Sequence, residues 1–108
     1  MISVHTRWLV AAVLVLAATR GVAQTATAPP RQIALCATCH GTLGLGNTPD
    51  APHLAGQPRV YLVTQLKAFR GGTRKHEVMS IIAKTLSDED IDTLTDWFSS
   101  VQLEVHRP

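Results

Sequence analysis

Apolar residues recur at the three- and four-residue spacing of α-helices in four separate stretches of the chain. No stretch alternates apolar and polar residues as a half-buried strand does, and no internal repeat appears. The pattern therefore predicts an all-α fold. The four predicted inner faces consist of Ile33, Cys36, Ala37 and His40; Tyr61, Leu62, Leu66 and Phe69; Met79, Ile82, Ala83 and Leu86; and Ile91, Leu94, Phe98 and Val101.

Prolines and glycines mark where the first two helices begin and end. Pro30 and Pro58 precede the first two apolar faces, and proline is well tolerated where a helix opens because the N–H it lacks would have no helical partner there. Gly41 follows the first face, and the pair Gly71-Gly72 follows the second. Glycine readily adopts the left-handed conformation that ends helices. These residues therefore set the limits of both helices.

The last helix has a start signal of a different kind. Ser87 followed three residues later by Asp90 resembles a capping box, in which two side chains satisfy free backbone N–H groups at a helix start. The acidic residues of the first turn also suit the positive end of the helix dipole. We expect this helix to run to about Val101.

The stretch from Gly41 to Gln57 has neither helical nor strand periodicity, and glycines and prolines interrupt it repeatedly. A loop of this length is uncommon in a small domain unless it serves a binding function. We therefore interpret it as a loop that takes part in binding.

The amino-terminal region has the order of residues that is typical of a secretory signal. His5 and Arg7 precede an apolar run at positions 8–18, and small residues follow, with the expected cleavage after Ala23. A retained membrane anchor is the alternative, but the run is shorter than the ~20 residues that span a bilayer. We predict a cleaved signal peptide at 1–23, a flexible leader at 24–30 and one domain at 31–108.

Charge is distributed unevenly along the predicted mature chain. Removal of Arg7 and Arg20 from the ten basic residues leaves eight, against eight acidic residues. Six cations and one anion lie within 59–84, whereas residues 88–104 carry only acidic charges. This pattern predicts either a charge dipole that steers partners or two solvated helix faces. The balanced charge and the predicted export disfavour nucleic-acid binding.

The sequence Cys36-Ala37-Thr38-Cys39-His40 is the attachment pattern of c-type haem. Two thiols at this spacing can add to the two vinyl groups of a porphyrin, and the adjacent imidazole can bind its iron. A thioredoxin-like redox pair also has this cysteine spacing but requires a βαβ context. A zinc site would need a further Cys or His pair. We therefore predict one covalently bound haem.

A haem iron bound by histidine on one face needs a ligand on the other. Met79 is the only methionine of the predicted mature chain, and methionine opposite histidine is an arrangement of electron carriers. The plain alternative is a methionine that fills a gap in the core. His53 and His76 are competing ligands, and His106 lies close to the terminus.

A metal-bound histidine normally donates its second ring N–H to a fixed acceptor, which sets the orientation of the ring. Pro52 lies twelve residues after His40 in the predicted loop and offers a carbonyl with no N–H of its own. We hypothesise that this carbonyl is the acceptor. The alternative is an ordinary turn proline.

Taken together, these residues resemble the class I c-type cytochromes, specifically the short bacterial monohaem kind and each half of the related dihaem proteins. The resemblance covers about residues 31–101. Trp97 stands where the last helix of that family usually has a tyrosine. The resemblance is carried, in order, by C-A-T-C-H-G from Cys36, P-H-L-A-G-Q from Pro52, Tyr61-Leu62, Gln65-Leu66, Phe69-Arg70-Gly71, Met79 and Leu86-Ser87-Asp88.

The resemblance implies a cytochrome c fold of about four to five helices around one haem c with its iron. It implies thioether bonds at Cys36 and Cys39, His40 as the proximal iron ligand, the Pro52 carbonyl as its acceptor and the Met79 sulfur as the distal ligand. An iron with both axial positions filled has no open site for substrate. The expected role is therefore electron transfer and not catalysis.

These expectations lead to one main functional hypothesis and two alternatives. The main hypothesis is a monomeric periplasmic carrier of single electrons between membrane complexes or exported dehydrogenases and terminal oxidases or reductases, with no membrane span in the mature chain. One alternative is a permanently bound haem subunit of an exported oxidoreductase. The other is a haem enzyme with a five-coordinate iron.

Overall fold

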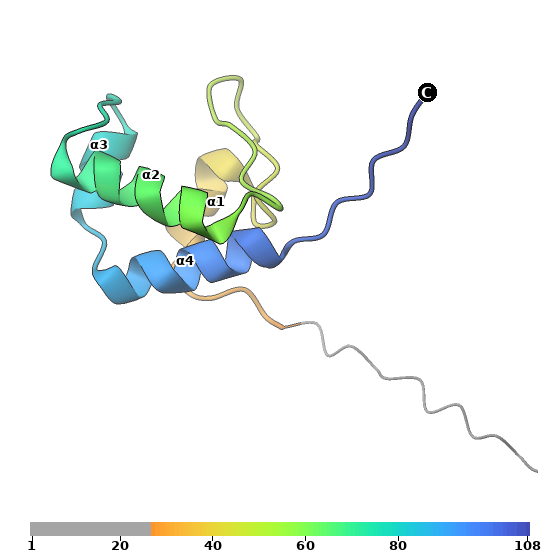
Figure 1. Ribbon diagram of the computed structural model, residues 1–108, viewed down its shortest axis with the longest axis horizontal. Coiled ribbons are helices and arrows are strands. Elements are labelled where there is room, and N and C mark those ends of the chain that lie inside the picture. The colour runs from red at the N-terminus through yellow and green to blue at the C-terminus, as the bar shows by residue number, and fades with distance from the viewer. Residues whose placement is uncertain (1–26) are drawn as a thin grey trace, which may run out of the picture.

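A computed structural model describes residues 27–108, and four α-helices connected by loops make up this part of the chain (Figure 1). No strand occurs between residues 27 and 108, so the predicted all-α fold is confirmed. The predicted signal peptide, 1–23, and the first residues of the leader lie outside the described residues. The helices are α1 (Ile33–His40), α2 (Arg59–Gly71), α3 (Met79–Lys84) and α4 (Asp88–Ser100).

The predicted limits of α1 and α2 are confirmed to within three residues. The N–H of Ile33 donates to the Pro30 carbonyl at 3.0 Å, so the chain begins to turn at this proline. Gly41 ends α1 with a φ of 75°, and its N–H donates to Ala37 O. Gly72 ends α2 in the left-handed conformation that favours glycine.

The helices α2 and α4 lie side by side and run in opposite directions (Figure 1). Arg59, the first residue of α2, forms ion pairs with Asp92, near the middle of α4, and with Asp96 in its second half. Arg70, at the other end of α2, pairs with Asp88, the first residue of α4, at 2.6 Å. Because these side chains are largely exposed, the pairs contribute little stability and mainly record the alignment of the helices.

The core lies where α1 meets the pair formed by α2 and α4. Ile33 of α1, Leu62 of α2, and Leu94 and Phe98 of α4 are each at most 6% exposed and form one cluster. Ile91 is also fully buried, in the first half of α4. The inner faces predicted for these three helices therefore pack against one another through their most buried residues.

Several residues of the predicted inner faces are less buried than expected. Tyr61 is 47% exposed because it lies beside Leu62 at the edge of the apolar face, and Leu66 is half-buried. Leu86 is half-buried and follows α3, which already ends at Lys84. Val101 is half-buried and follows the last residue of α4. Periodicity identified the faces correctly but extended the last two beyond the helix ends.

The capping box predicted for the last helix is present. Asp90 donates its N–H to Ser87 Oγ at 3.0 Å, and the Asp90 carboxylate accepts the N–H of Ser87 at 3.0 Å. These bonds hold the pKa of Asp90 below its ordinary value, chiefly through the backbone N–H of Ser87. The start of α4 is thereby fixed by its own sequence.

Across residues 27–108, none of the helices combines the length and the hydrophobicity that crossing a bilayer requires.

Candidate haem site

The helix α1 brings both cysteines and the adjacent histidine to its inner side. Cys36 and Cys39 are free thiols, and both are half-buried. Cys36 packs against the core cluster, and His40 at the end of the helix is only 7% exposed. The cysteines are three positions apart, about one helical turn, so both thiols and the imidazole share one side of α1.

The His40 ring is oriented by the loop that follows. Its Nδ1 lies 2.8 Å from the carbonyl oxygen of Pro52. A carbonyl only accepts, so Nδ1 carries the proton and donates it, and Nε2 is left with a free lone pair. A neutral imidazole held in this way is prepared to bind a metal through Nε2. The contact between His40 and Pro52 on which the hypothesis depends is therefore present.

Asn47 fastens the same loop to the end of α1. Its backbone N–H donates to Cys39 O at 2.8 Å, and its side-chain amide donates to Ala37 O at 3.0 Å. Cys39 O has no partner within the helix, and Ala37 O gains a second donor besides the Gly41 N–H, so the two bonds tie the loop to the end of α1. Sequence reasoning did not single out Asn47. A lone asparagine in a polar loop gives no signal that distinguishes it from its neighbours.

Gly44 closes the loop against α4. Its carbonyl accepts the N–H groups of Leu54 and Ala55 at 2.7 and 3.1 Å, which brings the two halves of the loop together. Its φ is 81°, and a Cβ at this position would lie 2.7 Å from Ala55 N and 2.8 Å from Phe98 Cδ1. Only glycine satisfies both the conformation and the close approach. The Pro52 carbonyl, which accepts from His40, therefore lies in a tightly folded loop.

Trp97 joins this loop to the last helix. Its indole N–H donates to Thr42 O at 2.7 Å, and its half-buried ring packs against the core cluster. The residue at the position of the family's usual tyrosine therefore ties α4 to the turn that directly follows α1.

Burial raises the pKa of the Cys36 thiol, although a hydrogen bond from its own backbone partly opposes this effect. A thiol with a raised pKa is protonated at neutral pH and is a poor nucleophile or disulfide-exchange group. This argues against the thioredoxin-like alternative, as does the helical surrounding of the motif in residues 27–108. Within that range, no three His, Cys, Asp or Glu side chains form a cluster that could hold a metal ion.

Met79 is the first residue of α3 and is half-buried. Its backbone N–H donates to Nδ1 of His76 at 3.2 Å. The competing histidines also use their Nδ1 atoms locally, since His53 accepts the N–H of Gly46 at 2.8 Å. His106 lies in the exposed carboxyl-terminal tail. Among the candidates for the distal position, Met79 is half-buried, whereas the three histidines are exposed.

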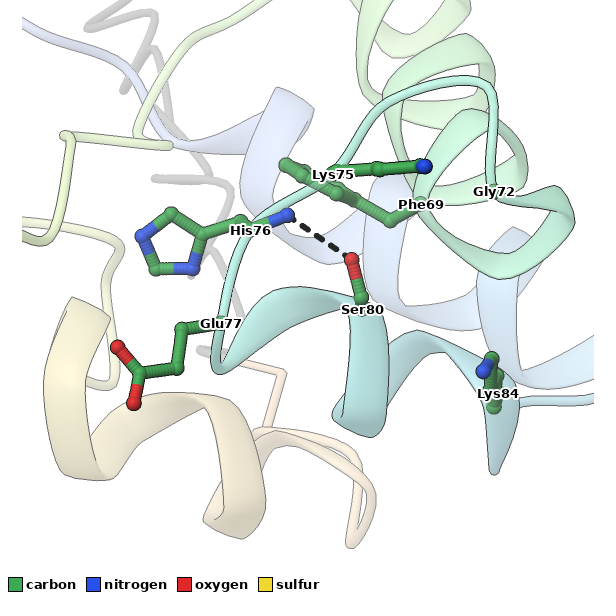
Figure 2. A pocket seen from close by; sticks show the side chains of 7 residues that line it. All are labelled: Phe69, Gly72, Lys75, His76, Glu77, Ser80 and Lys84. Atoms are coloured by element: carbon green, nitrogen blue, oxygen red, sulfur yellow. Dashed lines mark hydrogen bonds between the residues drawn. The ribbon is translucent and has the colours of Figure 1, made fainter.

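The charge separation is smaller than the sequence predicts. Arg59 and Arg70 of the basic segment are paired with carboxylates of the acidic segment because α2 and α4 lie alongside each other. Lys75 and Lys84 remain without an ion pair within residues 27–108 and border an open hollow of about 510 Å³ (Figure 2). The hollow is lined by Phe69, Gly72, Lys75, His76, Glu77, Ser80 and Lys84.

Comparison with known proteins places the chain in a family. The sequence model of the family described as Cytochrome c matches residues 31–102. The chain belongs to the class I c-type cytochromes. Its cofactor is a covalently bound haem c with iron, as in the family, and the similar proteins are named as cytochromes or as an electron acceptor.

The relatives differ in how much of their own length this cytochrome covers. Cytochrome c-554(548) of Halomonas halodenitrificans is 42% identical over 78 residues, which are 69% of this chain and 94% of that protein. A thiosulfate dehydrogenase electron acceptor of Stutzerimonas stutzeri is 40% identical over 66% of this chain, and cytochrome c4 of Pseudomonas aeruginosa is 34% identical over 74%. The chain spans only 34% and 40%, respectively, of these two relatives.

The residues present fit the haem that the family carries. Free Cys36 and Cys39 lie on the inner side of one helix, and the Pro52 contact occupies Nδ1 of His40, so that Nε2 is the ring nitrogen available to a metal. The bound haem supplies an iron that takes up and releases one electron. Pro52 orients the His40 imidazole, and Asn47 ties the loop to the end of α1. Such hydrogen bonds set the ring orientation and the basicity of a metal-bound histidine.

Proposed function

We propose that this cytochrome is a periplasmic carrier of single electrons, with haem bound to Cys36 and Cys39 and with His40 and Met79 as axial ligands. The observation that carries the proposal is the 2.8 Å contact between Nδ1 of buried His40 and the Pro52 carbonyl. This contact favours the tautomer that binds iron, and Pro52 contributes it from the loop that follows the motif, twelve residues after His40. It therefore adds a geometric observation to the evidence of the motif.

Met79 is proposed as the distal ligand because its side chain is half-buried while the backbone N–H is anchored to the segment before α3. A thioether opposite an imidazole raises the reduction potential relative to two nitrogen ligands. With both axial positions filled by protein, the iron exchanges electrons without binding substrate. This supports a carrier over the alternative of a five-coordinate haem enzyme.

An absorption spectrum in both redox states tests the two parts of this site together. We expect a haem spectrum that remains with the polypeptide after denaturation, and a sulfur-to-iron charge-transfer band in the oxidised protein. A colourless but compact protein with two free thiols would contradict covalent haem. A haem protein without the band would contradict ligation by Met79 and leave the proximal site intact.

Export is proposed from the signal-like segment 1–23, with cleavage after Ala23, a leader at 24–30 and the cytochrome domain at 31–108. Haem c proteins need the cysteines reduced and the haem delivered where attachment occurs, and the segment order is typical of exported chains. Sequencing the amino terminus of the mature protein tests this. A terminus at Gln24 supports the proposal, whereas a retained Met1 contradicts it.

The proposed partners are redox proteins with acidic docking surfaces, such as exported dehydrogenases, membrane complexes or terminal oxidases and reductases. One relative is named as the electron acceptor of thiosulfate dehydrogenase, which makes an exported sulfur-oxidising dehydrogenase a suitable donor to examine first. Lys75 and Lys84 border an open hollow and have no acidic partner in residues 27–108, so they are available for such contacts.

Ionic strength tests this docking proposal, because at 0.1 M salt the interactions between exposed charges are largely screened beyond about 10 Å. The rate of electron exchange with an acidic redox protein is expected to fall as salt rises. At low salt, Lys75→Glu and Lys84→Glu are each expected to exchange electrons more slowly than the natural protein. Arg107→Glu reverses one charge in the exposed tail and serves as the matched control. Equal rates at all salt concentrations would contradict steering by this surface.

A permanently bound haem subunit is the second candidate. It is favoured by exposed apolar side chains such as Val60 and Ile81, which are 74% and 68% exposed. Sedimentation of the protein purified from its source decides between the two. A monomer supports the diffusing carrier, and a stable complex with an oxidoreductase supports the subunit.

A further inference from the structure

The helix α3, which starts with Met79, is poorly supported by its own residues. It contains six residues, and Val78 at its N-cap makes no side-chain capping hydrogen bond. The first N–H groups of any helix lack partners within the helix, and so short a helix is unstable by itself. An outside group has to hold its first turn.

The ring of His76 supplies this group. Its Nδ1 lies 3.2 Å from the backbone nitrogens of both Val78 and Met79. Because both are N–H donors, Nδ1 is the ring nitrogen without a proton. The backbone N–H of His76 donates to Ser80 Oγ at 2.9 Å (Figure 2), and the N–H of Ser80 donates to the His76 carbonyl at 3.0 Å. These reciprocal bonds resemble a capping box in which an imidazole replaces the usual hydroxyl or carboxylate.

The same ring is also held against α2. The ring centroids of His76 and Phe69 are 6.4 Å apart with an interplanar angle of 75°, which is the edge-to-face arrangement. Phe69 is 7% exposed, and the guanidinium of Arg74 lies 4.5 Å from its centroid. His76 therefore connects the first turn of a short helix to a buried residue of a longer one.

We propose that His76 is a positioning residue for Met79: its imidazole fixes the backbone from which the methionine sulfur reaches the haem iron. This inference rests on the proposed ligation by Met79. His76 itself does not bind the iron in this account. Without its ring, the first turn of α3 opens more often, the sulfur leaves the iron more often, and an external ligand replaces it more easily.

Binding of external imidazole to the oxidised haem protein measures this opening. Loss of a helix cap typically shifts such an equilibrium by roughly fivefold, so His76→Ala is expected to bind imidazole about five times more tightly than the natural protein. His76→Asn should stay near the natural value, because asparagine also caps helices. Ser80→Ala should show a smaller increase. His106→Ala, which removes an exposed imidazole from the tail, is the matched control and should show none.

The sulfur-to-iron band separates failure of this inference from failure of the ligand assignment. If the natural protein shows the band but His76→Ala binds imidazole with unchanged affinity, the positioning role is wrong. The role is also wrong if His76→Asn is as defective as His76→Ala, since the cap would then not be the cause. If His76→Ala does not fold, imidazole binding is compared between Ser80→Ala and the natural protein. An unchanged affinity in Ser80→Ala would then contradict the positioning role. A natural protein without the band overturns ligation by Met79 and this inference with it.

Discussion

The two candidate ligands of the iron are held by opposite structural means. His40 is buried at the end of α1, and its ring is fixed by Pro52 in a loop that Asn47 and Gly44 also fasten to the rest of the protein. Met79 begins a six-residue helix whose first turn is held by His76, only three residues earlier. The proximal side therefore depends on contacts between distant segments, and the distal side on local hydrogen bonds supported by Phe69.

The contrast indicates that Met79 should be easier to release than His40. Several loop contacts must break together before His40 can turn away, whereas opening one short helix would free Met79. Regions with few buried contacts open at lower free energy than core segments. We therefore expect changes on the proximal side to affect global stability, and changes on the distal side to affect ligation first.

The largest effect is expected from Met79→Leu. Leucine keeps the apolar volume but has no sulfur, so the charge-transfer band should vanish and the reduction potential should fall on the order of 0.1 V, within the ~0.8 V range that haem surroundings span. Absorption spectra and redox titration measure both. Ile81→Leu, at an exposed position of α3, is the matched control. A charge-transfer band that persists in Met79→Leu would show that Met79 is not the distal ligand.

A matched pair of glycine substitutions tests the proximal side. Gly44→Ala forces a Cβ into a left-handed residue and against Ala55 N and Phe98, so we expect a loss of about 2–4 kcal/mol of unfolding free energy. Gly71→Ala meets nothing within 4 Å at the end of α2 and should be neutral or slightly stabilising. Denaturant unfolding of the haem protein measures both. Equal stabilities would mean that the loop tolerates a side chain at position 44.

A smaller loss is expected from Asn47→Ala. The substitution removes the bond to Ala37 O and leaves a carbonyl at the end of α1 with one partner fewer, which typically costs about 1 kcal/mol. Thr38→Ala, which removes a longer bond of 3.4 Å on the exposed side of α1, is the control and should cost less. Denaturant unfolding can rank the two. If Thr38→Ala proves the more costly, Asn47 does not fasten the loop as described.

The smallest effect concerns acid. A hydrogen bond from the Arg70 guanidinium lowers the pKa of Asp88, and the Ser87 N–H lowers that of Asp90. Carboxylates with a lower pKa in the folded state stabilise it above their unfolded pKa, near 3.9, and lose this effect as pH falls through the folded pKa. Unfolding temperatures should thus decrease below about pH 4. Asp90→Asn should weaken this dependence, and an unchanged pH profile in that variant would contradict the role of the capping box.

Local signals in the sequence predicted most of the helical structure. Pro30, Gly41 and Gly72 act on the backbone beside them, and the bonds between Ser87 and Asp90 span a single turn, so each could be read directly. Burial was harder to predict, because Tyr61 and Val101 lie at the edges of apolar faces whose outer limits depend on the neighbouring helices. The burial of Thr95 was not predicted, because the residue is polar. In the structure its hydroxyl donates to Ile91 O within α4, which satisfies the buried group.

The candidate site was predictable where a single motif carries it. Cys36, Cys39 and His40 follow from their spacing, whereas the bonds from Asn47 to α1 and from Trp97 to Thr42 join segments whose approach no local pattern specifies. The pairing of Arg59 with the acidic helix was missed for the same reason, since it requires knowing that α2 and α4 run antiparallel. The assignment of all five haem-site residues stays a prediction until the spectra are measured: Cys36, Cys39, His40, Met79 and Pro52.

The intact mass of the mature protein, followed by mass analysis of its peptides, shows whether haem is covalently bound. We expect the polypeptide to be heavier by the mass of one haem, and the added mass to stay with the peptide containing Cys36 and Cys39 after denaturation. A folded protein with the mass of the polypeptide alone and two titratable thiols would contradict this expectation.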